Sequence, residues 1–278
     1  MFRHSAFALV LTLGTVAAAD AFATDLPPEV YAPEISAGSV GVGWYLRGDL
    51  GYAVKMSPGT PNYKIVSAGG GVSSVDNFDE TRLDKNFSYG GGIGYQLNDI
   101  FRADVTADVF TSGLSGTSSS SSPCATTQNA GTSCSYSHSG EMKGISVLGN
   151  VYADLGTFSG LTPYVGAGAG LTDVKWGTVR ATGSCVDGAG ACNGASYAAT
   201  SYGGEDSWRF TYALMAGMSY DINSQMKLDL GYRYSHTGGG DMFGYSAAEQ
   251  ALGASGVKGS DDGFSRHEVR AGLRIITW

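Results

Sequence analysis

The sequence predicts an all-β fold, an eight-stranded antiparallel up-and-down transmembrane β-barrel with four long external loops. Three observations support this prediction. Eight segments alternate apolar and polar residues with a period of two, as a β-strand with two different faces does. Short and long connections alternate between these segments, as in outer-membrane barrels. Aromatic residues gather at both ends of the apolar faces, where they would form belts at the membrane surfaces.

Each predicted strand has about ten residues or somewhat more, and a tilted strand needs roughly 9–11 residues to cross a bilayer. In the first strand Trp44, Leu46 and Leu50 share one face, whereas Arg47 and Asp49 share the other. A closed sheet leaves no unpaired edge in lipid, which makes a barrel the viable β-structure there. The predicted strands cover residues 43–54, 87–97, 100–110, 142–155, 162–174, 207–222, 226–236 and 264–277.

Alternation alone would also fit a soluble barrel with its apolar face turned inward. The connections favour the membrane alternative, because the short turns fall at one end and the long loops at the other. The turns lie near 98–99, 156–161 and 223–225, and the loops cover about 55–86, 111–141, 177–206 and 237–263. The predicted aromatic belts contain Trp44, Tyr95, Phe101 and Tyr220 at the turn end, and Tyr52, Phe87, Trp208, Phe210, Tyr234 and Phe264 at the loop end.

The first 23 residues have the features of a signal peptide. A short basic start is followed by an apolar run over 6–19 and by Ala21-Phe22-Ala23, which fits the small-x-small cleavage rule. We place the cut after Ala23, with Ala19 as the alternative. The apolar run is too short for a spanning helix, which needs about 20 residues.

Residues 24–42 contain three prolines and are predicted to form an extended periplasmic tether, so the barrel occupies 43–278 as the only folded domain. The net charge of −8 and the pI near 4.9 argue against nucleic acid as a partner. The 43 glycines show no Gly-X-Y period, which excludes a collagen-like chain.

The predicted inner face carries seven basic and seven acidic residues. An unpaired buried charge costs several kcal/mol, so equal numbers indicate an ion-paired interior. An eight-stranded barrel has room only for its own side chains, and we therefore expect a closed lumen. Three expected pairs are Arg233–Glu268, Arg270–Asp49 and Arg274–Asp229. The full predicted set is Arg47, Asp49, Arg102, Asp104, Asp108, Asp154, Arg209, Asp221, Lys227, Asp229, Arg233, Glu268, Arg270 and Arg274.

The four cysteines form two close pairs, each inside one predicted external loop. In an oxidising compartment this spacing predicts the disulfides Cys124–Cys134 and Cys185–Cys192. Metal binding is the alternative, but two cysteines with His138 fall short of the usual four ligands. We therefore assign no metal and no cofactor.

A lipid hydrolase on the outer barrel wall is a further alternative. Ser235 and His236 lie at the rim of the seventh predicted strand, with Glu268 on its neighbour. However, Glu268 faces the lumen in the predicted register, and the His-x-Ser-Asn pattern of such enzymes is absent. A solvated rim histidine is the simpler interpretation, and no catalytic residue is assigned.

Five segments carry a resemblance to known proteins: Asp25–Pro28, Trp44–Tyr52, Leu161–Gly170, Gly231–Tyr234 and His267–Leu273. They resemble one protein family, the small porin-like, opacity-type outer-membrane antigens of alphaproteobacteria. The resemblance covers the mature chain except its loops and marks the scaffold rather than an activity. It implies an OmpA-like barrel that serves envelope integrity and surface contact. Some members are associated with haem binding or adhesion, but neither can be assigned to residues here.

Together these observations predict a non-enzymatic structural surface protein in the outer membrane of a Gram-negative bacterium. A narrow porin for small solutes is the main alternative, and a lipid-active hydrolase is a weaker one. The expected partners are outer-membrane lipid and lipopolysaccharide, the barrel-assembly machinery and an external ligand that the sequence does not identify.

Overall fold

The computed structural model describes residues 42–67, 69–120, 124, 132–186 and 195–277. The expected signal peptide, the tether up to residue 41 and Cys192 lie outside these residues. Among the described residues, no α-helix is long and apolar enough to cross a membrane. The elements are β1 (Gly43–Pro58), β2 (Asn62–Val66), β3 (Val72–Asn77), β4 (Glu80–Leu83), β5 (Phe87–Gln96), β6 (Phe101–Ser120), β7 (Ser133–Asp154), β8 (Leu161–Trp176), β9 (Val179–Val186), β10 (Thr200–Tyr202), β11 (Asp206–Asp221), β12 (Met226–Gly244), α1 (Ala247–Ala251) and β13 (Val257–Ile276).

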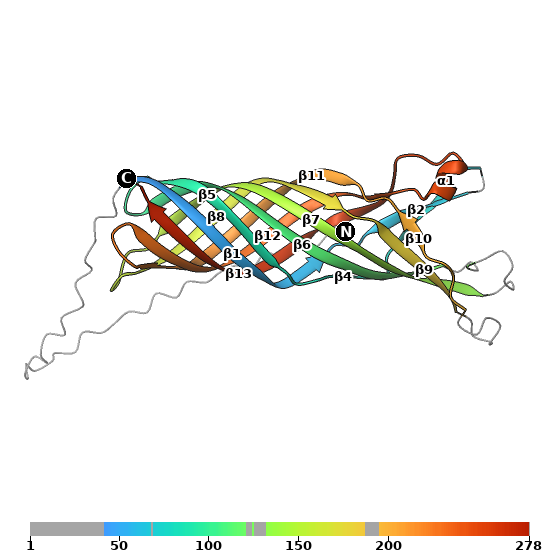
Figure 1. Ribbon diagram of the computed structural model, residues 1–278, viewed down its shortest axis with the longest axis horizontal. Helices are drawn as coiled ribbons and strands as arrows, with labels where there is room; N and C mark the ends of the chain where they lie inside the picture. Colours follow the sequence, from blue (N-terminus) through green and yellow to red (C-terminus); the bar gives the residue numbers. More distant parts are fainter. Residues whose placement is uncertain (1–41, 68, 121–123, 125–131, 187–194, 278) are drawn as a thin grey trace, which may run out of the picture. The chain divides into compact units, whose positions relative to one another are not determined.

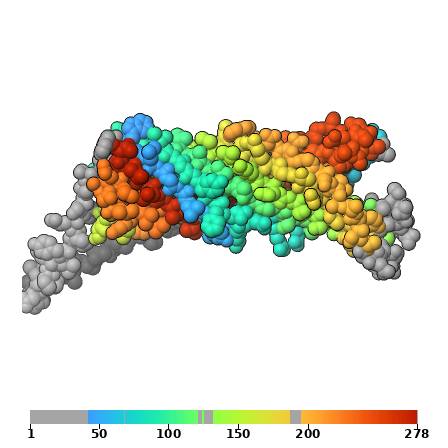
Figure 2. All heavy atoms as spheres, in the orientation of Figure 1, coloured from blue at the N-terminus to red at the C-terminus, as the bar shows by residue number. Residues whose placement is uncertain are grey.

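Eight of these strands close into a ring, which confirms the predicted barrel. The ring order is β1, β5, β6, β7, β8, β11, β12 and β13, and all its neighbouring pairs are antiparallel. Strand β13 pairs with β1, from Tyr45 opposite Ile276 to Pro58 opposite Phe264, and so closes the ring. Figures 1 and 2 show the first strand, in blue, directly beside the last, in red.

The outer wall of the ring is apolar, as the alternation predicts. On β1, Leu46 and Leu50 are 51% and 54% exposed, whereas Asp49 between them is 7% exposed. The same contrast holds on β6, where Val105 points outward and Asp104 inward. A soluble barrel would reverse both faces, so this band of exposed apolar side chains is the lipid-facing surface.

The predicted loops contain more strand than the sequence suggested. Strands β6 and β7 stay paired up to Ser120 opposite Cys134, and β12 and β13 stay paired up to Gly244 opposite Val257. Strands β2, β3, β4, β9 and β10 and helix α1 also lie within ranges predicted as loops. The strands extend past their predicted ends because an apolar outward face marks a strand only where lipid surrounds the barrel. Outside the membrane the outward face contacts water and no longer needs to be apolar.

We call the part of the barrel beyond the membrane the outer extension. It comprises β2, β3, β4, β9, β10, α1 and the loop-side ends of β6, β7, β12 and β13. Strand β9 pairs with β7, and β2 pairs with β13, so the extension continues the barrel sheet. It encloses an apolar cluster, the outer core, whose buried members are Tyr63, Phe78, Leu83, Phe110, Leu114, Met142, Val174, Trp176, Val179, Met242, Phe243 and Phe264.

The prediction of the aromatic belts is wrong for one residue, Phe264. Phe264 is 3% exposed and belongs to the outer core, where its ring centroid lies 6.1 Å from that of Phe110. Its position explains this, because Phe264 shares the inward phase of Arg266 and Glu268 on β13. The neighbouring belt residues Trp208 and Phe210 are 64% and 60% exposed, as predicted.

Candidate functional site in the barrel interior

The barrel interior contains a continuous set of ion pairs, and Arg47 joins several strands near its middle. The Arg47 guanidinium lies 2.7 Å from Asp49 and 2.8 Å from Asp104, and it donates to the Tyr152 hydroxyl at 3.0 Å. The Tyr45 hydroxyl also donates to Asp104, at 3.0 Å. These contacts connect β1 with β6 and β7 across the lumen.

A second cluster lies further toward the outside and centres on Asp108 and Glu268. Arg233 contacts Asp108 at 2.8 Å and Glu268 at 3.0 Å, so it bridges the two carboxylates. Arg270 contacts Asp108 at 2.6 Å, and Arg266 contacts Glu268 at 2.7 Å. Both carboxylates are fully buried. The cluster therefore joins β6, β12 and β13 through charged side chains that are almost completely shielded from bulk water.

The turn end of the lumen contains three further ion pairs. Arg274 lies 3.0 Å from Asp229, which also accepts a short hydrogen bond from Ser219. Arg102 lies 3.1 Å from Asp154. The pair Lys227–Asp221, at 2.5 Å, lies nearest the turn and is the most exposed, because the Asp221 side chain is 32% exposed.

Arg102 shows how aromatic rings take part in the interior. Its guanidinium carbon lies 4.1 Å from the Tyr152 ring centroid and 4.8 Å from the Tyr164 centroid. Both terminal nitrogens lack a hydrogen-bond partner among the described residues. Burying these nitrogens without partners costs free energy. Contact with the two ring faces compensates part of that cost, since cation–π contacts strengthen when the groups are desolvated.

Two glycines make room for large inward rings. A Cβ on Gly94 would lie 2.2 Å from the Tyr45 ring, and one on Gly144 would lie 2.1 Å from the Phe110 ring. Real Cβ atoms do not approach carbon this closely, so a side chain at either position would displace the ring. Glycine at these two positions therefore serves the packing of the interior.

At the outer end, Arg209 and a belt of hydroxyl groups complete the polar interior. Arg209 Nη1 donates to both carboxylate oxygens of Asp261 at 2.8 Å. The hydroxyls of Ser146, Thr172, Thr211 and Thr237 follow one another across β7, β8, β11 and β12, at 2.8, 2.7 and 3.0 Å. Arg266 then contacts the outer core, with its guanidinium carbon 3.8 Å from the Phe110 ring centroid.

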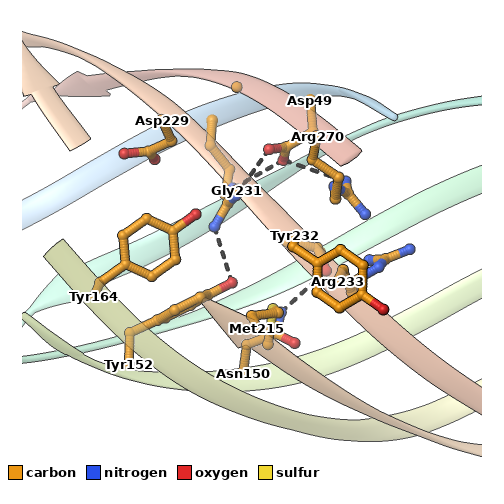
Figure 3. A pocket seen from close by; sticks show the side chains of 13 residues that line it. Asp49, Asn150, Tyr152, Tyr164, Met215, Asp229, Gly231, Tyr232, Arg233 and Arg270 are labelled. Carbon is orange, nitrogen blue, oxygen red and sulfur yellow. Dashed lines mark hydrogen bonds and ion pairs between the residues drawn. The ribbon is translucent and has the colours of Figure 1, made fainter. Parts of the chain in front are cut away.

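The space left between these side chains is small. A cavity of about 20 Å³ lies among Arg47, Asp49, Tyr152, Tyr164 and Arg233. Figure 3 shows the side chains of this region converging from opposite strands. A single water needs roughly 10–15 Å³ of such volume. This cavity therefore has room for about one water molecule.

The structure places all fourteen predicted lumen residues on the inward faces. All three predicted pairs are present: Arg233–Glu268 and Arg274–Asp229 at 3.0 Å, and Arg270–Asp49 at 3.7 Å. Arg270 also forms a closer pair with Asp108, at 2.6 Å. Arg266 is an unpredicted member of the lumen set, although it has the same even-numbered phase as Glu268. Asp261 falls in a predicted loop, so its pairing with Arg209 could not be anticipated.

The cysteines lie in the outer extension. A disulfide joins Cys124 to Cys134, with Cα atoms 4.9 Å apart. Cys185 is also disulfide-bonded, and it lies directly opposite Cys134 in the β7–β9 register. Cys134 and Cys185 therefore lie opposite each other on β7 and β9, and each belongs to a disulfide. Among the described residues no group of three or more His, Cys, Asp or Glu side chains could hold a metal ion.

The residues considered as a hydrolytic triad are not assembled. His236 Nδ1 lies 3.0 Å from Ser265 Oγ, and its ring contacts Tyr212 on the outer wall at 5.5 Å. Glu268 is buried in the lumen on the opposite face of the sheet. Ser235 is 5% exposed and faces inward. The three groups thus lie on two different sides of the barrel wall.

Comparison with known proteins places the chain in a family. The model of the outer membrane protein beta-barrel domain matches residues 6–273. An uncharacterized protein of Brucella suis is 38% identical, with 84% of each chain covered. A protein of Rickettsia bellii named as a candidate adhesin is 28% identical, covering 84% of this chain and 87% of its own length. Among solved structures, neisserial surface protein A is similar with a TM-score of 0.42 and 18% identity, covering 85% of this chain and 99% of that chain.

The chain belongs to the outer-membrane β-barrel family, because the family model covers almost its whole length. It is therefore a protein of the outer membrane of a Gram-negative bacterium. The closed ring and its exposed apolar band agree with this location.

Proposed function

We propose that this protein is a structural, non-enzymatic surface protein whose barrel is closed to solutes. Its membrane part would support envelope integrity, and its outer extension would provide surface contact. The observation that carries the proposal is the filled lumen, in which buried ion pairs leave a cavity of about 20 Å³. The apolar outer core adds a second closure above that network. The relative of Rickettsia bellii named as a candidate adhesin supports a role in surface contact.

The partners follow from the same surfaces. Lipid and lipopolysaccharide would cover the exposed apolar band, and the barrel-assembly machinery would insert the chain. An external ligand would bind the outer extension. No cofactor is part of the proposal.

Conductance of the refolded protein in planar bilayers tests the closed lumen. We expect no steady open steps, whereas an open porin in the same bilayers serves as the positive control. Long-lived steps that disappear when an Asp49→Cys variant is blocked by a thiol reagent would contradict the proposal. That outcome would favour the narrow porin for small solutes.

A further inference from the structure

The outer extension contains a second cavity, which is much larger than the space in the lumen. Its volume is about 300 Å³, at the small end of the roughly 300–1,000 Å³ of ligand pockets. One wall comes from β7, β9 and β10 and the other from β2, β12 and β13, with α1 beside them. Tyr63, Tyr136, Tyr202, Phe243 and Ala181 are among its lining residues.

The charges at this cavity already have partners. Lys258 forms a short ion pair with Glu249, whose backbone lies in α1. The Lys258 ammonium also lies 5.0 Å from the Tyr202 ring centroid. Glu249 in addition completes the capping box with Ser246 at the start of α1. The cavity therefore presents rings and a neutralised ion pair, rather than a free charge.

One buried polar atom at the cavity, His138 Nδ1, has no hydrogen-bond partner in the part of the chain that the structure describes. His138 is 6% exposed and lines the cavity, and its ring centroid lies 4.4 Å from that of Phe78. His138 Nε2 lies 2.8 Å from Ser118 Oγ, but Nδ1 has no hydrogen-bond partner among the described residues. A buried polar atom without a partner costs about 1–3 kcal/mol. A ligand that forms a hydrogen bond with this nitrogen would remove that cost, which favours its binding.

The neighbouring hydroxyls determine what that group must be. The Tyr63 hydroxyl donates to Ser118 Oγ at 3.2 Å. Ser118 can then direct its own proton to His138 Nε2, which assigns the imidazole proton to Nδ1. Burial, and secondarily Lys258, lower the pKa of His138 to about 4, so the ring is neutral and carries one proton at pH 7. The unpartnered atom is then a donor, and it requires an acceptor oxygen.

We infer that this cavity binds a small, uncharged, ring-bearing molecule that presents a hydrogen-bond acceptor to His138 Nδ1. The aromatic walls select a flat ring, because stacked or edge-on rings add about 0.5–1.5 kcal/mol beyond their buried area. The internal Lys258–Glu249 pair disfavours a charged ligand, since a further charge would be desolvated without a partner.

Three probes of nearly equal shape test this inference. Benzamide is neutral, benzoate is an anion and benzamidine is a cation. Binding to the refolded, full-length mature protein in detergent micelles is measured by saturation-transfer NMR and by calorimetry. We expect saturable benzamide binding that is at least 10-fold tighter than that of either charged probe. Tighter binding of benzoate would overturn the inferred ligand class, and the absence of saturable benzamide binding would overturn the site.

Two variants locate the binding, and one serves as a control. His138→Phe keeps a ring but removes the Nδ1 donor, and we expect about 2- to 10-fold weaker benzamide binding. Ala181→Trp fills the cavity and should abolish binding. His236→Phe changes a histidine on the outer wall and should leave binding unchanged. Unaltered affinity in His138→Phe would overturn the inference, and that variant decides the result if Ala181→Trp does not fold.

Discussion

Two regions of the interior differ in chemistry although the same strands form both. On the inward face of β6, Arg102, Asp104 and Asp108 belong to the ion-paired lumen. Further along the same face, Phe110 and Leu114 belong to the outer core. The outward face changes in the opposite sense, from Val105 and its neighbours to serine and threonine.

Strand β7 repeats this inversion. Its outward residues are Ser135, Ser137 and Ser139 in the outer extension and Val147 and Val151 in the membrane. Whether lipid or water surrounds the barrel wall therefore determines which side chains face its interior. Lipid requires an apolar outer face and leaves the polar residues for the lumen. Water permits a polar outer face, so the apolar residues can form a core.

Breaking the ion-paired lumen should have the largest effect. Glu268→Gln removes the charge that Arg233 and Arg266 share, and leaving buried charges uncompensated costs about 3–5 kcal/mol. We expect a loss of that size in the free energy of unfolding in urea. Glu80→Gln is the matched control, because its pair with Arg82 is exposed. Equal stability of Glu268→Gln and the wild type would show that the lumen pairs contribute little.

Truncation in the outer core should cost somewhat less and act locally. Leu114→Ala removes a side chain that is 4% exposed, and such truncations cost about 2–5 kcal/mol. Hydrogen exchange of the amides in the β6–β7 outer hairpin measures the effect. Ser115→Ala, on the outward face beside it, should change stability by less than about 0.5 kcal/mol. A similar loss in both variants would mean that the outer core is not packed.

Acid should weaken the outer extension before the membrane part. The pKa of His138 is about 4 in the folded protein and 6.5 as a free side chain, mainly because of burial. The unfolded state therefore binds more protons between these values, and stability falls as the pH decreases from 6.5 toward 4. The titratable side chains of Tyr63, Tyr136 and Lys258 line the same cavity as His138.

Exchange of the β7 amides, corrected for the intrinsic pH dependence, measures this loss. His138→Phe should flatten the pH dependence across that window. A pH profile identical in the variant and the wild type would assign the acid sensitivity to another group.

Loss of the Cys124–Cys134 disulfide should have the smallest effect on the barrel. It joins Cys134, the last β7 residue paired with β6, to Cys124 beyond the end of β6, and so lies at the outer tip of the hairpin. We expect faster proteolysis of the hairpin tip in Cys124→Ser/Cys134→Ser and an unchanged urea midpoint for the barrel. A lower midpoint would show that the outer extension and the membrane part unfold together.

The membrane part of this fold could be predicted from sequence because lipid imposes a strict alternation. Asp49 between two exposed leucines is an unambiguous signal. The outer extension could not be predicted in the same way. Leu114 lies among serines and glycines, with no apolar outward face to mark a strand. The role of Asp261 could not be predicted for a related reason. Its pairing with Arg209 depends on the end of a strand that the sequence analysis predicts as a loop.

Side-chain accessibility along β6 tests the inversion most directly. Spin labels placed singly from 101 to 119, in the oxidised protein in lipid bilayers, are exposed to lipid-phase oxygen and to a water-soluble nickel complex. We predict oxygen access at 101, 105 and 109, nickel access at 113, 115 and 117, and little access to either at 104, 108, 110 and 114. High nickel access at 110 and 114, with protected labels at 113 and 115, would contradict an apolar core above an ion-paired lumen.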